Sequence, residues 1–511
     1  MENSRTLNTS RNIIAGFINR LVSILLPFIN RTIIIYVLGA EFSGLDSLFM
    51  SILAVLSIAE LGFHTAIVYS MYGPIAEGNN QRICELLTLY RKIYYIVGAA
   101  ILGIGIILFP MLPQLIHGEV PTSIDLYWAF GLYLTNSVIS YFMFSYKESL
   151  LIANQRQDIS QFIRTIMIAL QNVLQIGILL LFRNYYLYLT VTILCTILTN
   201  IGIELETNKY YPECKCIKGK KVRMPLEMRK QVGGLFICSL CDKARNSFDS
   251  IILSVLLGLT VVAIYNNYFY IYMALYGIIL MVCNSMGASV GNCIATESKE
   301  KNYQDLQRFS LLAAWLTGWF SICMLCLYQP FMQLWVGKDL MLDNWDMMLF
   351  CLYFYVINMN NVRNQYSAGS GIWWEMRYAF LLETVANCVL NLVLGKLFGV
   401  TGILVATIIT IFFFNFLWRT VLLFRIYFDN QGLRQFLLHN LEWFLAVLAA
   451  AGITYGICAL LPLTPLGQLI GNGVVCLLVP NVVLYVLLRK TETFQPARDT
   501  VGHVLGHFIK R

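Results

Sequence analysis

The chain has 511 residues, of which 58% are hydrophobic and 13% are charged, and its mean hydropathy is +0.67. Soluble domains are about half apolar and about a quarter charged, so this composition excludes an ordinary soluble protein of this length. The formal net charge is +8. In a membrane protein such an excess is typical of loops on the cytoplasmic side, and it does not predict nucleic-acid binding.

Long apolar runs recur from Ile13 to Leu488, each close to the ~20 residues that a helix needs to cross a bilayer. Short polar or Pro/Gly-containing segments separate them, and no long run alternates between apolar and polar residues as a strand would. The sequence therefore predicts an all-α integral membrane protein with about fourteen transmembrane helices. The predicted spans are residues 12–38, 42–69, 92–113, 124–146, 160–182, 185–206, 232–257, 261–290, 309–335, 345–366, 377–398, 400–425, 441–461 and 466–488.

The basic residues predict the orientation, because Lys and Arg concentrate in cytoplasmic loops. With both termini in the cytoplasm, 29 of the 36 basic residues fall in predicted cytoplasmic segments, when bases towards the cytoplasmic ends of the spans are counted with the loops. Three fall in predicted external segments, namely Arg183, Lys338 and Lys396, and the other four lie deeper inside spans. We therefore expect a multi-pass protein of the bacterial inner membrane with cytoplasmic N- and C-termini.

Two short internal similarities indicate a repeat. Tyr36–Gly39 resembles Ser254–Gly258 at the end of the seventh span, and Gln171–Gln175 resembles Asn387–Asn391. Copies six helices apart enter the membrane from the same side, so we predict two parallel six-helix lobes around a central cavity, followed by two C-terminal helices. The predicted boundaries are 1–208 for the N-lobe, 209–231 for a basic cytoplasmic loop, 232–430 for the C-lobe, and 431–511 for the last two helices and the tail.

Four bases lie inside predicted spans. Arg20 and Arg31 are eleven residues apart in the first span and return to nearly the same helix face. Lys243 and Arg245 lie in the seventh span, the equivalent helix of the other half. A buried charge costs about 2.5–3.5 kcal/mol in a membrane helix and usually faces a bundle interior or an aqueous cavity. Guanidinium and ammonium groups suit an anionic substrate, and the planar fork of Arg fits phosphate oxygens, so these four are the predicted contacts for a phosphate group.

Acidic and titratable residues accompany these bases. Glu60 and His64 are one helical turn apart in the second span, and Asp242 and Asp249 share a face of the seventh span with Arg245. They are candidates for coupling transport to Na+, H+ or the membrane potential. Simple pairing with neighbouring bases is the alternative, and the sequence leaves both open.

Amide side chains inside the spans are candidates for hydrogen bonds to sugar hydroxyls, although helix packing is the commoner reason for such residues. The candidates are Asn30, Gln171, Gln175, Asn387 and Asn391.

The segment from Ile35 to Asn79 reads IYVLGAEFSGLDSLFMSILAVLSIAELGFHTAIVYSMYGPIAEGN. It resembles the Wzx-like polysaccharide branch of the multidrug/oligosaccharidyl-lipid/polysaccharide (MOP) exporter superfamily. The resemblance implies alternating access between two lobes and export of undecaprenyl-pyrophosphate-linked repeat units for O-antigen, capsule or exopolysaccharide. It also implies membrane lipids, glycosyltransferases and a polysaccharide polymerase as partners.

Three alternatives remain. A cation-coupled multidrug exporter of the same superfamily would be expected to carry an acid in the first helix, where this chain has bases. A peptidoglycan-precursor (lipid II) flippase also has fourteen helices and a basic cavity, and only the Ile35–Asn79 segment favours the polysaccharide branch. A membrane-embedded polymerase or glycosyltransferase would need catalytic loops, whereas the longest external loop, Gly337–Trp345, offers only Asp339 and Asp343.

No cofactor or metal is expected, and the chain reads as a transporter and not as an enzyme. Most of the 14 cysteines, including Cys323 and Cys476, lie in apolar runs where a thiol behaves as a small hydrophobic group. The basic loop holds Cys214 and Cys216 without further ligands. No GxxxxGK[ST] loop for nucleotide is present.

Overall fold

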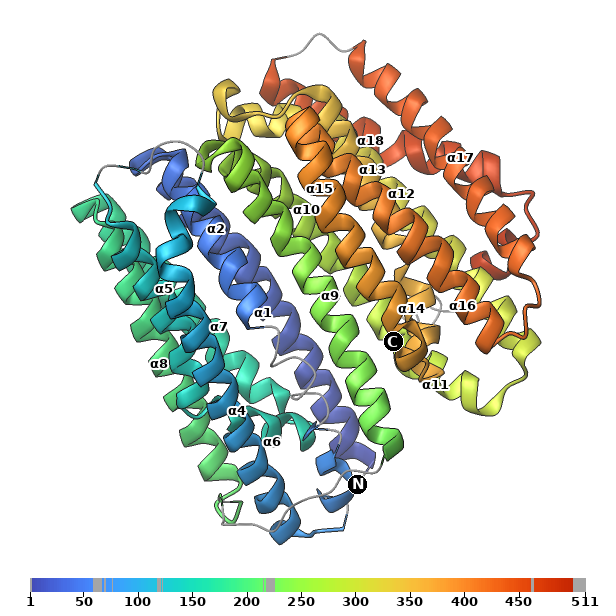
Figure 1. Cartoon of the computed structure of the whole chain (residues 1–511). Coiled ribbons are helices and arrows are strands. Elements are labelled where there is room, and N and C mark those ends of the chain that lie inside the picture. Colours follow the sequence, from blue (N-terminus) through green and yellow to red (C-terminus); the bar gives the residue numbers. More distant parts are fainter. Residues whose placement is uncertain are drawn as a thin grey trace. The chain divides into compact units, whose positions relative to one another are not determined.

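The computed structural model describes residues 2–57, 67–68, 70–75, 77–116, 121, 123–214, 216, 226–460 and 464–499. Within these ranges the chain is helical and contains no strand. Contact density divides it into two compact units, Met1–Ala263 and Ile264–Arg511. Figure 1 shows the helices of both units coloured along the sequence.

The first unit is a bundle in which α1 packs along α7, α7 along α8, and α5 between α4 and α8. Its helices are α1 (Glu2–Val37), α2 (Ala40–Leu56), α4 (Asn80–Leu108), η1 (Phe109–Leu115), α5 (Leu126–Phe142), η2 (Ser145–Lys147), α6 (Glu148–Ala153), α7 (Gln157–Phe182), α8 (Tyr185–Tyr210) and α9 (Leu226–Leu257).

Polar residues set where these helices begin. The Asp125 carboxylate accepts hydrogen bonds from the backbone N–H groups of Tyr127 and Trp128, and the Asn184 side chain accepts one from Leu187. The first N–H groups of a helix have no partner within it, so a side-chain acceptor at this position stabilises the helix start. The predicted spans 124–146 and 185–206 therefore each begin at a helix cap.

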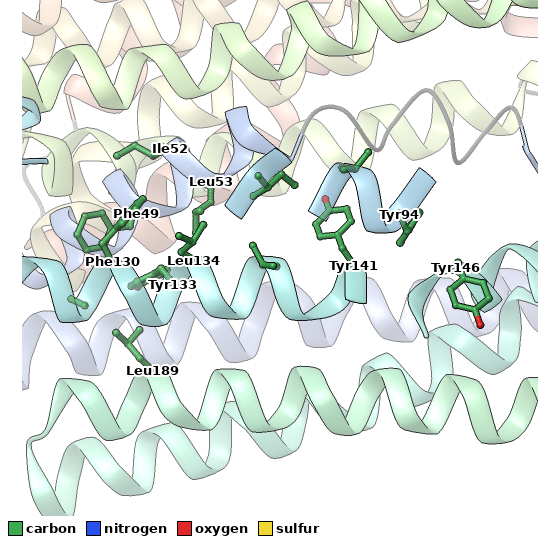
Figure 2. Packing of buried hydrophobic residues seen from close by; sticks show 14 of the residues in the cluster. Phe49, Ile52, Leu53, Tyr94, Phe130, Tyr133, Leu134, Tyr141, Tyr146 and Leu189 are labelled. Carbon is green, nitrogen blue, oxygen red and sulfur yellow. The ribbon is translucent and has the colours of Figure 1, made fainter. Parts of the chain in front are cut away.

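Aromatic and aliphatic side chains together fill the core of the first unit (Figure 2). Phe49 of α2 meets the edges of Phe130 and Tyr133 of α5, with ring centroids 5.3 and 5.4 Å apart. Such edge-to-face pairs add about 0.5–1.5 kcal/mol to the packing. They fix α5 against α2.

The helix α9 belongs by its packing to the first unit, because it lies along α2 (Figure 1). Beside it, Gly44 of α2 approaches the first residue of α10 (Leu259–Ser285), where an added Cβ atom would overlap the carbonyl oxygen of Leu259. The sequence predicts a C-lobe that begins at residue 232, with this helix at its start. The compact units divide after Ala263, within α10.

The second unit is built around α12, which packs against α13, α17 and α18. Its helices are α10 (Leu259–Ser285), which begins just before the division, α11 (Gly287–Thr296), α12 (Lys299–Trp335), η3 (Lys338–Leu340), α13 (Asn344–Asn358), α14 (Asn361–Gly369), α15 (Trp373–Thr410), the π-helix η4 (Ile411–Trp418), α16 (Arg419–Ile426), α17 (Leu433–Ala459) and α18 (Pro465–Leu488).

The long element α15 is two helices joined at Gly399, whose φ of 61° lies in the left-handed region. Three residues later an added Cβ at Gly402 would overlap the carbonyl oxygen of Leu394, so the chain reverses tightly here. The structure confirms the separate predicted spans at 377–398 and 400–425.

Two arginines that the sequence counted among cytoplasmic bases are buried inside the second unit. Arg419 pairs with Glu383 of α15. Arg363 of α14 donates to the Asn415 side chain at 2.9 Å, to the Phe416 carbonyl at 3.0 Å and to the Thr420 hydroxyl at 3.0 Å. The widened turn of the π-helix η4 turns the Phe416 carbonyl oxygen towards the Arg363 guanidinium. The count of 29 cytoplasmic bases therefore included two that hold helices together.

Nine helical stretches of the described chain are long and apolar enough to cross a membrane, and one of them, Trp373–Ile426, contains two predicted spans. The chain is a multi-pass, all-α integral membrane protein, as the sequence predicted.

Candidate functional site

A polar cavity of about 620 Å³ lies within the first unit, where α5, α7 and α8 diverge. Serine, threonine, asparagine and glutamine side chains make up most of its wall. The lining residues are Ser57, Tyr94, Asn136, Ser137, Ser140, Tyr141, Ser145, Glu148, Arg164, Met167, Ile168, Gln171, Thr196, Thr199 and Asn200.

Hydrogen bonds between α5 and α8 order the wall. The Thr196 hydroxyl donates to Asn136 at 2.8 Å, and the Asn200 amide donates to Ser140 at 3.3 Å. The Ser145 hydroxyl donates to the side-chain amide oxygen of Asn200 at 2.7 Å. Each hydroxyl has one proton and two acceptor sites, so these bonds leave capacity for a ligand. The wall is preorganised for a neutral molecule rich in hydroxyl groups.

One ion pair lies at the cavity. The Arg164 guanidinium donates to both carboxylate oxygens of Glu148, at 3.2 and 2.5 Å, and about 44% of the Arg164 side chain is exposed. The two charges compensate each other. Tyr94 and Tyr141, with ring centroids 5.4 Å apart, add apolar ring surface to the cavity wall.

The predicted anion-binding bases of α1 lie on a helix that packs against the cavity helix α7. Arg20 and Arg31 are both half-buried. Beside Arg20, the Asn19 amide donates to Thr165 of α7 at 3.0 Å. Arg31 donates weakly to the Ser47 hydroxyl of α2 at 3.3 Å.

Next to Ser47, Asp46 accepts a hydrogen bond from the Tyr133 hydroxyl, and Tyr133 lies 3.1 Å from the hydroxyl of Tyr185. Asp46 also interacts electrostatically with Arg31. An acid and a base of neighbouring helices α1 and α2 are thus held together in the first unit. The sequence did not single out Asp46 as a partner of Arg31.

The bases of α9 have unequal environments. Arg245 is buried and forms an ion pair with Asp242 at 3.4 Å, the pairing that the sequence left open beside a coupling role. Asp249 is buried, and Lys243 is exposed. Because α2 packs against both α1 and α9, the two base-bearing helices share one neighbour (Figure 1).

Four of the five predicted sugar contacts, Asn30, Gln175, Asn387 and Asn391, are hydrogen-bonded to other buried side chains. The Asn30 amide donates to Asn172 and Gln175 of α7 at 3.1 and 2.8 Å. In the second unit Asn387 donates to Thr407 at 3.1 Å, and Asn391 donates to Asn387.

All of these side chains are buried. A buried amide left without a partner in a membrane is costly, so these bonds are what helix packing requires of such residues. Gln171 is the one candidate of the five that lines the polar cavity.

Glu60 and His64 lie outside the described residues, and so do the bases of the inter-lobe loop between residues 217 and 225. Ser57, which precedes Glu60 by three positions in the sequence, lines the cavity.

Most of the cavity wall was not predicted, although the sequence contains a signal for it. Arg164, Met167, Ile168 and Gln171 recur at the spacing of one helix face, and Thr196, Thr199 and Asn200 do the same on α8. Arg164 lies at the cytoplasmic start of the predicted span 160–182 and counts there among the cytoplasmic bases, and the predicted sugar contacts include amides but no hydroxyl groups.

No family model matches the chain, and no curated protein matches it in sequence. Solved structures do share its fold. A structure described as the lipid II flippase MurJ in an inward closed conformation has a TM-score of 0.64 and 15% identity, over 94% of this chain and 98% of that one. A MOP superfamily transporter from Pyrococcus furiosus has a TM-score of 0.58 and 14% identity, over 84% and 96%.

The Vibrio cholerae MATE transporter VcmN in its bent form has a TM-score of 0.51 and 14% identity, over 84% of this chain and 99% of that one. At these identities the likeness establishes the fold, which is the fold of MOP-type transporters.

Proposed function

We propose that this chain is a MOP-superfamily flippase that moves undecaprenyl-pyrophosphate-linked oligosaccharide repeat units across the bacterial inner membrane, with both termini in the cytoplasm. The products serve O-antigen, capsule or exopolysaccharide synthesis, so glycosyltransferases supply the substrate and a polymerase consumes it. The fold shared with flippases and multidrug transporters supports transport as the general activity.

The observation that carries the substrate class is the polar cavity of the first unit. Its wall offers neutral hydroxyl and amide groups, two tyrosine rings and one compensated ion pair. A sugar presents many hydroxyl groups and apolar ring faces, and it carries no charge that such a wall would have to neutralise. A volume of about 620 Å³ is within the range of small-ligand sites.

The pyrophosphate needs cationic partners, and α1 provides Arg20 and Arg31 beside the cavity helix α7. Exposed Lys243 of α9 is the third candidate. Arg245 is buried and paired with Asp242, so we assign it a role in neutralising the acidic charge of α9 and not in binding phosphate. The polyprenyl tail stays in the lipid throughout.

Transport then follows alternating access. The inward-open state takes the pyrophosphate on the α1 bases and the sugars in the cavity, and rearrangement of the two lobes exposes the sugars outside. One charge moved through 100 mV is worth about 2.3 kcal/mol, so membrane potential or coupled Na+ or H+ is sufficient to bias direction. Asp46, close to Arg31, joins Glu60, His64, Asp242 and Asp249 as a coupling candidate.

A lipid II flippase is the second candidate, favoured by the extent of the structural likeness to MurJ. The two substrates share the lipid pyrophosphate and differ in what it carries. A multidrug exporter is less favoured because residues 12–38, the first span, contain two arginines and no acid.

The test uses sealed proteoliposomes and undecaprenyl-pyrophosphate-linked oligosaccharide with a label on its sugar. Protection of the label from an external enzyme measures flipping. We expect flipping that unlabelled lipid-linked oligosaccharide inhibits and that lipid II inhibits weakly. Stronger inhibition by lipid II would support the second candidate, and efflux of a cationic dye without any flipping would overturn the proposal.

A further inference from the structure

Three cysteines from three different helices meet inside the second unit. Cys326 lies on α12, Cys458 on α17 and Cys476 on α18, and all three are buried. Their Sγ atoms all lie within 4.8 Å of one another. Each of the three carries a free thiol.

A fourth thiol adjoins this cluster. Cys323 lies one helical turn before Cys326 on α12, and its thiol interacts electrostatically with the thiol of Cys476. The Sγ atom of Cys476 lies within 4.8 Å of those of Cys326 and Cys458. We call Cys323, Cys326, Cys458 and Cys476 the thiol cluster, with Cys476 at its centre.

The packing around the cluster holds two of its members in place. The Trp319 indole N–H of α12 donates to the carbonyl oxygen of Cys476 at 2.8 Å, and the Asn472 amide of α18 donates to that of Cys326 at 3.2 Å. Each bond links the helix of one cysteine to the helix of another. Such supporting bonds orient the ligands of metal sites.

A simpler explanation is that the cysteines serve as small apolar side chains, because they belong to the core where α17 and α18 pack on α12. Packing alone, however, does not require sulfur atoms from three helices to point at a common centre. Alanine or serine would fill the same space without that convergence.

The chemistry of the cluster suits a soft metal ion. Thiolates bind Zn2+ and Cu+ in preference to hard cations. Tetrahedral Zn2+ with Zn–S bonds of about 2.3 Å places its sulfur atoms about 3.8 Å apart, so shifts of about 1 Å convert the observed cluster into a coordination shell. Each thiol that binds releases its proton to solvent.

The charge of the site limits how many thiols ionise. Zn2+ with three thiolates has a net charge of −1, and a fourth thiolate makes it −2. The surrounding core is apolar, which disfavours the larger charge. Cys323 is only partly buried. Its thiol is therefore the one that stays protonated or binds the ion only reversibly.

We propose that the thiol cluster is a binding site for a soft d10 cation, Zn2+ or Cu+, which fastens the C-terminal helices α17 and α18 to α12. The site is independent of the transport cavity, which lies in the first unit.

The test uses the full-length protein purified in detergent, with reductant and without chelator. Metal content is measured by mass spectrometry, and binding by titration with Zn2+, with Cu+ under anaerobic conditions, and with Cd2+, whose thiolate bonds give an ultraviolet charge-transfer band. We expect about one equivalent per chain. Saturation with Zn2+ indicates a zinc site, and saturation with Cu+ alone indicates a copper site.

The matched variants are Cys476→Ala, at the centre of the cluster, and Cys388→Ala, a cysteine of α15 outside it. We expect Cys476→Ala to weaken binding at least tenfold and to abolish the rise in Tm that the metal causes, and Cys388→Ala to leave both unchanged. Cys323→Ala, at the partly buried member, provides a milder variant with a smaller loss.

Three results would overturn the proposal. The first is the absence of stoichiometric binding of all three ions to the reduced protein. The second is equal binding by the Cys476→Ala protein. The third is the loss of two titratable thiols in protein purified without reductant, with these mapped to the cluster, because that identifies a disulfide as its function.

Discussion

Arg419 and Glu383 form an ion pair inside the second unit, where their side chains are 1% and 2% exposed. The Arg419 guanidinium also lies over the ring of Phe380, 3.2 Å from its centroid. Arg363 is buried nearby, and its interaction with Arg419 is repulsive. One carboxylate thus compensates two buried guanidinium groups.

Removing that carboxylate should be severely destabilising. Glu383→Gln keeps the shape of the side chain and leaves two buried cations without a counter-charge, which costs about 3–5 kcal/mol. We expect a large fall in Tm in detergent. The matched control is Glu375→Gln, the same change at an exposed position of the same helix, which should shift stability by less than about 0.5 kcal/mol. Similar Tm values for the two variants would contradict the account of this cluster.

The close approach of α2 to the first residue of α10 predicts a strong effect at Gly44. Gly44→Ala places a methyl group against the Leu259 carbonyl and should cost about 1–3 kcal/mol by forcing the helices apart. Gly103→Ala in α4 has open space around the new atom and should be neutral or stabilising. Thermal unfolding of both proteins checks this, and a neutral Gly44→Ala would mean that the helices are less closely packed than described.

The cavity wall predicts a transport defect for a change that removes one hydroxyl group. Thr196→Val deletes a cavity hydroxyl and its bond to Asn136, and we expect at least a tenfold loss of flipping per folded molecule because a sugar-facing polar group disappears. Thr190→Val is the same substitution at an exposed position of the same helix. It should transport normally, and equal rates for the two would argue against the cavity as a sugar site.

Amides that pack between helices and amides that line the cavity should differ in their effects on stability and on flipping. Asn30→Ala removes bonds between α1 and α7 and should cost about 1 kcal/mol of stability while leaving flipping per folded molecule within a factor of two. Gln171→Ala should reduce flipping and leave Tm nearly unchanged, because Gln171 makes only a weak bond of 3.5 Å to Gln175. The reverse pattern would favour Asn30 as a sugar contact.

Local sequence spacing predicted the features that depend on one helix. The Asp242–Arg245 pair follows from residues three apart, and the division at Gly399 follows from two apolar runs too long for one span. Asn30 illustrates the limit. Its polarity was visible, but its partners lie on α7, and only tertiary packing decides whether an amide faces a cavity or another helix.

Buried charges were the second feature that the local sequence did not predict. Arg363 and Arg419 sit near the ends of predicted spans, so they counted as loop bases, and nothing in the local sequence indicates that η4 and Glu383 would enclose them. The thiol cluster was missed for the same reason, because its members come from three helices and each alone resembles a small apolar residue.

Flipping in proteoliposomes by the Arg20→Gln/Arg31→Gln double variant shows whether bases on the first helix bind the pyrophosphate of a lipid-linked sugar, with protein amount and Tm matched to the unmodified protein. Lys220→Gln, in the basic loop, removes a charge outside the proposed site and serves as control. We expect the double variant to lose flipping at least a hundredfold, because two charge-assisted contacts of about 1.5–3 kcal/mol each are removed, and Lys220→Gln to flip normally. Full flipping by the double variant would contradict this role of the two bases.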